Sequence, residues 1–182
     1  MRMSEIKKIA IANRGEVAVR IIRACQELGL SSVLLHSKAD VNTRAYRMSD
    51  EQICIGESEV GESYLSIEKN VDGVLASGAD AVHPGFGFLS ENADFARALK
   101  EKNIQFIGPS ADAIEKMGDK IQAKKIIQAA GVPAVPGYNG DDQSLETLSK
   151  EAKKIGYPVI VKAAAGGGGR GMKVIENDEH AE

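Results

Sequence analysis

The chain has 182 residues, 43% of them hydrophobic, which suits one ordinary domain or one and a half. Its 23 basic and 26 acidic residues are interspersed and leave a formal charge of −3, so no basic patch is available to track a nucleic-acid backbone. Only 4% of the residues are aromatic and none is tryptophan, which argues against a base-stacking surface.

The first part of the chain alternates short apolar runs with helical patterns. The apolar runs are typical of buried parallel strands and cover residues 9–12, 32–36, 53–55, 81–83 and 104–107. Helical patterns cover residues 17–28, which Gly29 ends, and residues 64–75 and 93–102. This alternation predicts an α/β fold with a doubly wound parallel sheet.

The pattern changes after Pro109. Ser110 is expected to cap a short helix, a longer one is expected over residues 119–130, and a proline-rich connection follows. A further helix (145–155) leads to two strands, 157–162 and 172–175. We therefore predict a first domain over residues 1–112, linker helices over 113–134 and a second subdomain over 135–182. Two strands cannot close a sheet, so that subdomain is expected to be incomplete.

The second subdomain contains a glycine-rich segment between its two strands. Lys162 closes the first strand, and five of the six residues from Gly166 to Gly171 are glycine. Closely spaced backbone N–H groups beside a lysine suit a phosphate chain, although a flexible linker has the same composition. The segment is expected to be loose until an anion or a packed neighbour orders it.

The turn Ile11-Ala-Asn-Arg-Gly-Glu16 has the strand-turn-helix layout of a dinucleotide fold. It contains one glycine where the dinucleotide pattern needs three, which argues against NAD or FAD. We interpret it as a structural turn at the carboxyl edge of the sheet.

Residues 83–92 (His-Pro-Gly-Phe-Gly-Phe-Leu-Ser-Glu-Asn) follow a predicted strand. Ser90 is expected to cap the next helix, which leaves His83 and Glu91 unexplained. Because α/β folds place their sites in loops at the carboxyl ends of strands, His83 and Glu91 are candidates for a site. Lys120, beside another glycine, becomes significant only if it reaches the same phosphates as Lys162.

The remaining features bear on the cellular environment. Cys25 and Cys54 both lie among apolar residues and are expected to be buried free thiols, which fits a reducing compartment. The three histidines make no metal-ligand spacing with them. No signal peptide or membrane-spanning run is evident, so a soluble, cytoplasmic protein is expected.

Taken together, these segments resemble the biotin carboxylase family. The matching segments occur in the family's order: Ile11-Ala-Asn-Arg-Gly-Glu16, residues 83–92, Phe106-Ile-Gly-Pro109, Met117-Gly-Asp-Lys120, Gly131-Val-Pro133, and Gly156-Tyr-Pro-Val-Ile-Val-Lys162 with the glycine-rich segment. The family includes subunits of acetyl-CoA and propionyl-CoA carboxylases and a domain of pyruvate carboxylase. The resemblance implies a Rossmann-like pre-ATP-grasp domain followed by linker helices and an ATP-grasp subdomain.

The resemblance also implies an activity and partners. Such an enzyme activates bicarbonate with Mg-ATP through carboxyphosphate and carboxylates the N1′ nitrogen of biotin. The biotin is held on a biotin carboxyl carrier protein, and a carboxyltransferase completes the reaction. The final acceptor, an acyl-CoA or a keto acid, is chosen by a different subunit or domain.

Individual residues acquire roles by the same resemblance. Lys120 and Lys162 would contact ATP phosphates, Gly168 and Gly169 would donate N–H groups, and Met172 would lie near the adenine. His83 and Glu91 belong to a segment that faces the active site. Arg23 and Glu27, four residues apart on the first helix, match dimer-interface positions, although such a pair can also be solvated.

The chain departs from the family in two residues and in length. Phe86 replaces the usual tyrosine, and Ala165 replaces a frequent glycine. Family members run to roughly 450 residues, and the remainder carries the adenine hinge, the Mg²⁺-binding glutamates and the groups that handle bicarbonate and biotin. Residues 1–182 alone are therefore expected to be inactive and to hold no metal.

Two alternatives stay open. One is another ATP-grasp ligase, of the carbamoyl-phosphate or purine-pathway type, which would share the phosphate loop but not residues 83–92. The other is a non-catalytic nucleotide-binding module, which would bind ATP through residues 1–182 alone.

Overall fold

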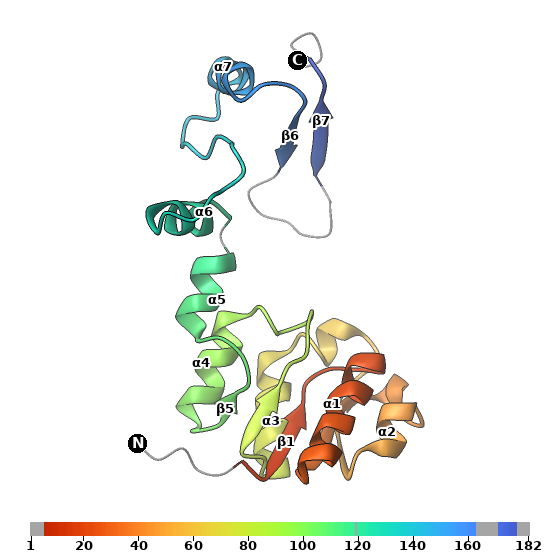
Figure 1. Cartoon of the computed structure of the whole chain (residues 1–182). Coiled ribbons are helices and arrows are strands. Elements are labelled where there is room, and N and C mark those ends of the chain that lie inside the picture. Colours follow the sequence, from red (N-terminus) through yellow and green to blue (C-terminus); the bar gives the residue numbers. More distant parts are fainter. Residues whose placement is uncertain (1–5, 119, 163–170, 178–182) are drawn as a thin grey trace. The chain divides into compact units, whose positions relative to one another are not determined.

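The computed structural model describes residues 6–118, 120–162 and 171–177, with the backbone alone for Lys120 and Ile121. The chain divides into two compact units, one ending at Glu115 and the other beginning at Lys116. Figure 1 shows the elements of both units along the chain.

A five-stranded parallel sheet forms the centre of the first unit. Its strand order is β3-β2-β1-β4-β5, so β1 is the central strand. Ile9 of β1 lies opposite Ser32 of β2 on one side and Ala81 of β4 on the other. The strands are β1 (Lys8–Ile11), β2 (Ser31–Ser37), β3 (Glu51–Gly56), β4 (Ala81–His83) and β5 (Gln105–Phe106).

Helices cover both faces of this sheet. On one face α1 and α2 pack against Ile9 and Ile11, and on the other α3 and α4 pack against Ala10 and Ala12. Successive strand residues point to opposite faces, so β1 supplies both cores. The doubly wound parallel sheet is thereby confirmed. The helices are α1 (Gly15–Leu28), α2 (Arg44–Met48), α3 (Ile67–Ser77) and α4 (Ala93–Glu101), with 3₁₀ turns at Lys38–Asp40 and Val60–Glu62.

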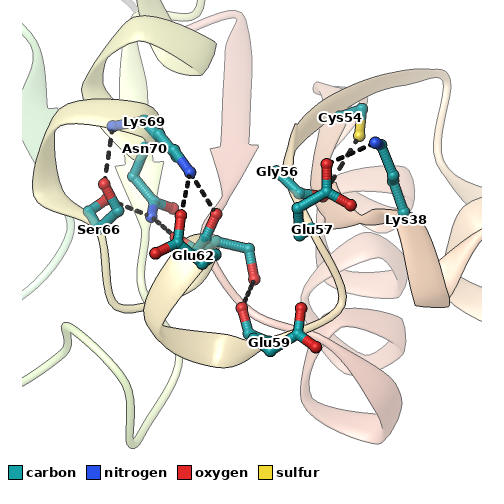
Figure 2. Close-up of polar contacts among 10 residues, drawn as sticks. Lys38, Cys54, Gly56, Glu57, Glu59, Glu62, Ser66, Lys69 and Asn70 are labelled. Atoms are coloured by element: carbon teal, nitrogen blue, oxygen red, sulfur yellow. Dashed lines mark hydrogen bonds and ion pairs between the residues drawn. The ribbon is translucent and has the colours of Figure 1, made fainter.

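The connection from β3 to α3 folds back tightly on the end of β3 (Figure 2). A Cβ at Gly56 would lie 2.0 Å from the carbonyl oxygen of Glu62, and the φ of Gly56 is +146°, so glycine is required there. Asn70, fully buried in α3, donates from Nδ2 to the carbonyl oxygens of Ser63 (3.1 Å) and Ser66 (2.8 Å). One amide thus ties this connection to the helix that follows it.

The helix predicted over residues 64–75 begins three residues late. Ser66 is the N-cap of α3, and its Oγ accepts a hydrogen bond from the Lys69 N–H. Tyr64 lies before the helix and is only 1% exposed. The spacing of apolar residues does not distinguish a buried residue that precedes a helix from one inside it. A capping serine, by contrast, marks where the helix begins. The short α2 was not predicted.

The prediction that both cysteines are buried is wrong for one of them. Cys25, on α1, is 2% exposed, but Cys54 is exposed. Cys54 lies on β3, an edge strand of the sheet, and its thiol donates weakly to the Gly56 carbonyl oxygen at 3.7 Å. An edge strand has one neighbour only, so an apolar run there does not ensure burial.

In the part that the structure describes, the second unit contains two helices and a small antiparallel sheet. Its elements, after α5 (Ala111–Gly118), which crosses the division, are α6 (Lys120–Ala129), α7 (Leu145–Ile155), β6 (Val159–Lys162) and β7 (Met172–Ile175). β6 and β7 pair with each other. Among the described residues, no helix is long and apolar enough to cross a membrane.

A buried polar network lies at the carboxyl end of β2. Asp40, 6% exposed, accepts hydrogen bonds from Ser37 Oγ (2.8 Å) and Tyr64 OH (2.9 Å), and the Ser37 N–H donates to that same hydroxyl (3.0 Å). The Arg14 guanidinium lies 3.3 Å from Asp40 and 5.7 Å from the centre of the Tyr64 ring. Burial of the phenol, with the adjacent Asp40 carboxylate, raises the pKa of Tyr64 to about 12.

This raised pKa predicts a loss of stability at alkaline pH. The folded state favours the neutral phenol, so its contribution is complete below the ordinary pKa of about 10 and is lost as the pH rises towards about 12. The lost contribution is on the order of 2–3 kcal/mol. Tyr64→Phe should destabilise the protein near pH 8, because Asp40 loses one of its hydrogen-bond donors and the Ser37 N–H loses its acceptor.

Urea unfolding of both proteins from pH 8 to 11.5 measures this difference. The stability gap between wild type and Tyr64→Phe is expected to shrink above pH 10. Parallel pH profiles for the two proteins would contradict the role assigned to the phenol.

Candidate functional site

The order in which strands are added to the sheet reverses between β1 and β4. From β1 it proceeds outwards to β2 and β3, and it then returns to place β4 on the other side of β1. In open α/β sheets, ligands bind outside the carboxyl ends of the strands at such a switch point. Asn13 and His83 both lie there, and the Ala12 N–H donates to the His83 carbonyl oxygen at 3.1 Å.

The turn after β1 is structural, as the sequence indicated. The Asn13 side chain, in a residue that is 2% exposed, donates from Nδ2 to the carbonyl oxygens of Pro84 (2.7 Å) and Phe86 (2.9 Å). Its Oδ1 accepts a hydrogen bond from the Arg14 N–H at 2.9 Å. The turn therefore binds the loop after β4 through the Asn13 side chain. Sequence reasoning assigned Asn13 no role, although a polar residue directly after a buried strand was a usable indication.

The loop after β4 places its polar and aromatic groups differently. His83 is half-buried, and its Nδ1 accepts a hydrogen bond from the Gly85 N–H at 3.1 Å. Burial lowers the pKa of His83, so the neutral ring is favoured. The Phe86 side chain is 70% exposed, and Glu91 is exposed as well. The loop thus presents a neutral imidazole and an aromatic ring near the switch point.

The cap predicted at Ser90 is wrong. Asn92 is the N-cap of α4, and its Oδ1 accepts a hydrogen bond from the Phe95 N–H at 2.9 Å. A cap bonds the third residue into its helix, and α4 begins at Ala93, so Ser90 is too early by two residues. By contrast, Ser110 does cap α5 as predicted, accepting from the Ala113 N–H at 3.2 Å.

An open pocket of about 1080 Å³ adjoins this loop within the first unit. His83, Gly85 and Phe86 line it together with Thr43 and with apolar and charged residues of α1 and α2. Glu91 is not among the lining residues, so the structure does not bring His83 and Glu91 together in this pocket. The charged lining residues are Glu16, Arg20, Arg23, Glu27 and Arg44.

The hairpin of the second unit brings two other predicted residues together. Lys162 and Met172 are directly opposite each other across β6 and β7, so their side chains lie on the same face. Ile160 and Val174, the next opposed pair on that face, are 54% and 57% exposed. The other face carries Ile175, which is buried. The exposed face therefore combines a lysine with an apolar surface.

Some predicted residues cannot be placed. Gly168 and Gly169, with the expected looseness of their segment, lie outside the described residues, as does the side chain of Lys120. Within the part of the chain that the structure describes, no group of three or more His, Cys, Asp or Glu side chains could hold a metal ion. The Mg²⁺ implied by the resemblance therefore finds no ligand set there.

Two family models match the chain. The model of the biotin carboxylase N-terminal domain matches residues 5–114. The model of the ATP-binding domain of the carbamoyl-phosphate synthase L chain matches residues 119–182. The two matches meet close to the division between the two units.

Individual relatives agree with these models. The biotin carboxylase of Haemophilus influenzae is 50% identical over 178 residues, which cover 97% of this chain and 40% of the relative. The mitochondrial methylcrotonoyl-CoA carboxylase subunit alpha of Dictyostelium discoideum is 49% identical over 182 residues, covering 100% of this chain and 26% of the relative. The chain thus spans about two fifths or less of the length of these relatives.

A solved structure extends the similarity to three dimensions. The biotin carboxylase domain dimer of Hydrogenobacter thermophilus 2-oxoglutarate carboxylase, in complex with MgADP, ADP and bicarbonate, matches with a TM-score of 0.89 at 47% identity. The match covers 98% of this chain and 39% of that one. The fold, the order of the motifs and both family models agree, and the chain therefore belongs to the biotin carboxylase family.

Proposed function

We propose that the chain is the amino-terminal part of an ATP-dependent biotin carboxylase, which carboxylates carrier-bound biotin with bicarbonate through carboxyphosphate. The observation that carries this proposal is the face of the β6–β7 hairpin that combines Lys162 and Met172 with exposed apolar side chains. Mg-ATP is the nucleotide substrate in this reaction. The reaction itself is inferred from membership of the biotin carboxylase family.

The exposed hairpin face suits the two halves of ATP. The Ile160 and Val174 side chains offer an apolar surface of the kind that an adenine ring covers. The Lys162 ammonium stands where β6 enters the glycine-rich segment and would neutralise phosphate charge. Fixed positive charge and N–H donors stabilise a transferring phosphoryl group. We assign Gly168 and Gly169 as N–H donors, Met172 to the adenine side and Lys120 as a second phosphate contact.

The first unit would serve the substrates other than ATP. Its pocket contains His83 and Phe86 but no glycine-rich phosphate turn. We place the loop that carries His83 and Glu91 on the side of the active site that receives biotin and bicarbonate. Phe86 can pack against a ligand there but donates no hydrogen bond, unlike the tyrosine of the family.

We also propose partners. A biotin carboxyl carrier protein would present biotin, and a carboxyltransferase would deliver the carboxyl group to an acceptor. The relatives include a methylcrotonoyl-CoA carboxylase subunit and a 2-oxoglutarate carboxylase, so the acceptor is not assigned. Arg23 and Glu27 are exposed on α1, where they also line the pocket beside His83, and they are offered as dimer contacts, as in a family that contains a solved dimer.

Biotin-stimulated ATP hydrolysis tests the proposed reaction. In a full-length carboxylase that carries residues 1–182, phosphate release in the presence of bicarbonate is expected to rise when biotin is added. Residues 1–182 alone are expected to show no stimulation and weak or no ATP binding by calorimetry. No stimulation in the full-length protein would overturn the proposal, and tight ATP binding by residues 1–182 would favour a nucleotide-binding module.

Lys162→Gln tests the phosphate contact in the same full-length protein. Loss of a charged hydrogen bond should lower kcat/KM for MgATP by at least about fivefold, equivalent to about 1 kcal/mol. Lys173→Gln is the matched control, because Lys173 lies opposite Val161 on the other face of the hairpin. Equal effects of the two substitutions would reduce Lys162 to a surface lysine.

Arg23→Glu tests the dimer interface. In the full-length protein it should shift sedimentation from dimer to monomer, because it reverses the charge at a proposed contact. Lys100→Glu, on the exposed side of α4 across the sheet, is the control and should leave the dimer intact. A persistent dimer in the Arg23 variant would remove that residue from the interface.

A further inference from the structure

We propose that Asn13 is a positioning residue of the biotin carboxylase site, which holds the turn of residues 84–86 and so places Phe86 and His83 along the pocket. This inference rests on the proposed function for its catalytic consequence. The positioning itself rests on geometry within the first unit.

Every polar atom of the Asn13 side chain is used. Its Nδ2 has two hydrogens and donates to two carbonyl oxygens, those of Pro84 at 2.7 Å and Phe86 at 2.9 Å. Its Oδ1 accepts a hydrogen bond from the Arg14 N–H, which fixes the orientation of the amide. Since the residue is 2% exposed, water cannot readily replace these bonds. The carboxamide therefore joins the end of β1 to the loop after β4.

Gly85 shows how closely this loop is pressed against Asn13. It lies between the two carbonyl groups that Asn13 binds, and its φ is +65°. A Cβ at this position would lie 2.8 Å from Asn13 Nδ2 and 2.5 Å from Val17 Cγ1. The turn of residues 84–86 therefore packs directly against the Asn13 amide, with no room for a side chain at Gly85.

The positions of Phe86 and His83 depend on the contact between this turn and Asn13. The Phe86 ring is 70% exposed, so few contacts of its own hold it, while its carbonyl oxygen is bound to Asn13. The Gly85 N–H, inside the same turn, donates to His83 Nδ1. The far end of the loop has a separate anchor, because Phe88 stacks on Tyr64 with ring centres 5.0 Å apart. Asn13 is thus the anchor of the end that lines the pocket.

The consequence for catalysis is selective. The candidate ATP contacts at Lys120, Lys162 and Met172 belong to the second unit, whereas the turn belongs to the first. Loosening the turn should therefore weaken the use of biotin and leave the KM for MgATP unchanged. A general loss of folded protein would instead lower kcat and leave both KM values unchanged.

Asn13→Asp is the informative substitution. It keeps the shape of the side chain and the Oδ1 acceptor but faces two carbonyl oxygens with a carboxylate oxygen in place of a donor. Asn13→Ala removes the bonds without introducing charge. Asn70→Ala is the matched control, because Asn70 is an equally buried amide that donates to three main-chain carbonyl oxygens. These belong to Ser63, Tyr64 and Ser66, so none of them lies in residues 83–88 (Figure 2).

The first measurement needs no catalysis. The 182-residue chain contains no tryptophan, so Phe86→Trp provides a single fluorescent reporter at an exposed site. Asn13→Asp and Asn13→Ala are expected to lower its anisotropy and to increase acrylamide quenching at least twofold. Asn70→Ala should change neither, at a temperature where circular dichroism shows every variant folded. Unchanged anisotropy in the folded Asn13 variants would overturn the positioning role.

The second measurement uses the full-length carboxylase. Asn13→Asp is expected to raise the KM for biotin at least fivefold and to change the KM for MgATP less than twofold, with Asn70→Ala changing neither. A loosened turn with an unchanged KM for biotin would overturn the catalytic consequence. If the unsubstituted enzyme shows no biotin stimulation, the proposed function fails, while the reporter measurement still decides whether Asn13 holds the turn.

Discussion

Buried polar groups at the carboxyl edge of the parallel sheet need hydrogen-bond partners inside the protein. Two adjacent side chains of the β1–α1 turn provide these partners. Asn13 binds the carbonyl groups of the loop after β4, and Arg14 pairs with the buried Asp40 after β2. A buried polar group without a partner costs on the order of 1–3 kcal/mol, so these contacts are a condition of the fold. Because β1 is central, one turn can reach the loops on both sides and join them into one edge.

The two units present different kinds of surface. The first presents a neutral histidine and an exposed aromatic ring beside a pocket lined with charges of both signs. The second presents a lysine on an exposed apolar face, opposite Met172. In the proposed function, the second surface is the one that would bind the nucleotide.

Most elements could be predicted because their periodicity is strong and their ends carry specific residues. The bounds of α7 and β7 match the prediction to the residue, and Ser110 caps α5. Two of the errors share a cause, which is that a local sequence pattern does not show which residues pack against it. The apolar run around Cys54 lies on an edge strand, where one side has no partner. Tyr64 continues a helical pattern but is held outside the helix by Asp40 and Ser37, which are distant in sequence.

By itself, the sequence determined the class of fold, the succession of most strands and helices along the chain, and the family, because these follow from periodicity and from motifs contiguous in the chain. It also located His83, Lys162 and Met172 as candidates. Only the tertiary structure decided which of them share a surface: Lys162 and Met172 do so across the hairpin, whereas Glu91 lies outside the pocket that His83 lines. It also revealed Asn13, because the carbonyl groups that Asn13 binds lie about seventy residues away in the chain and approach it only when β4 pairs with β1.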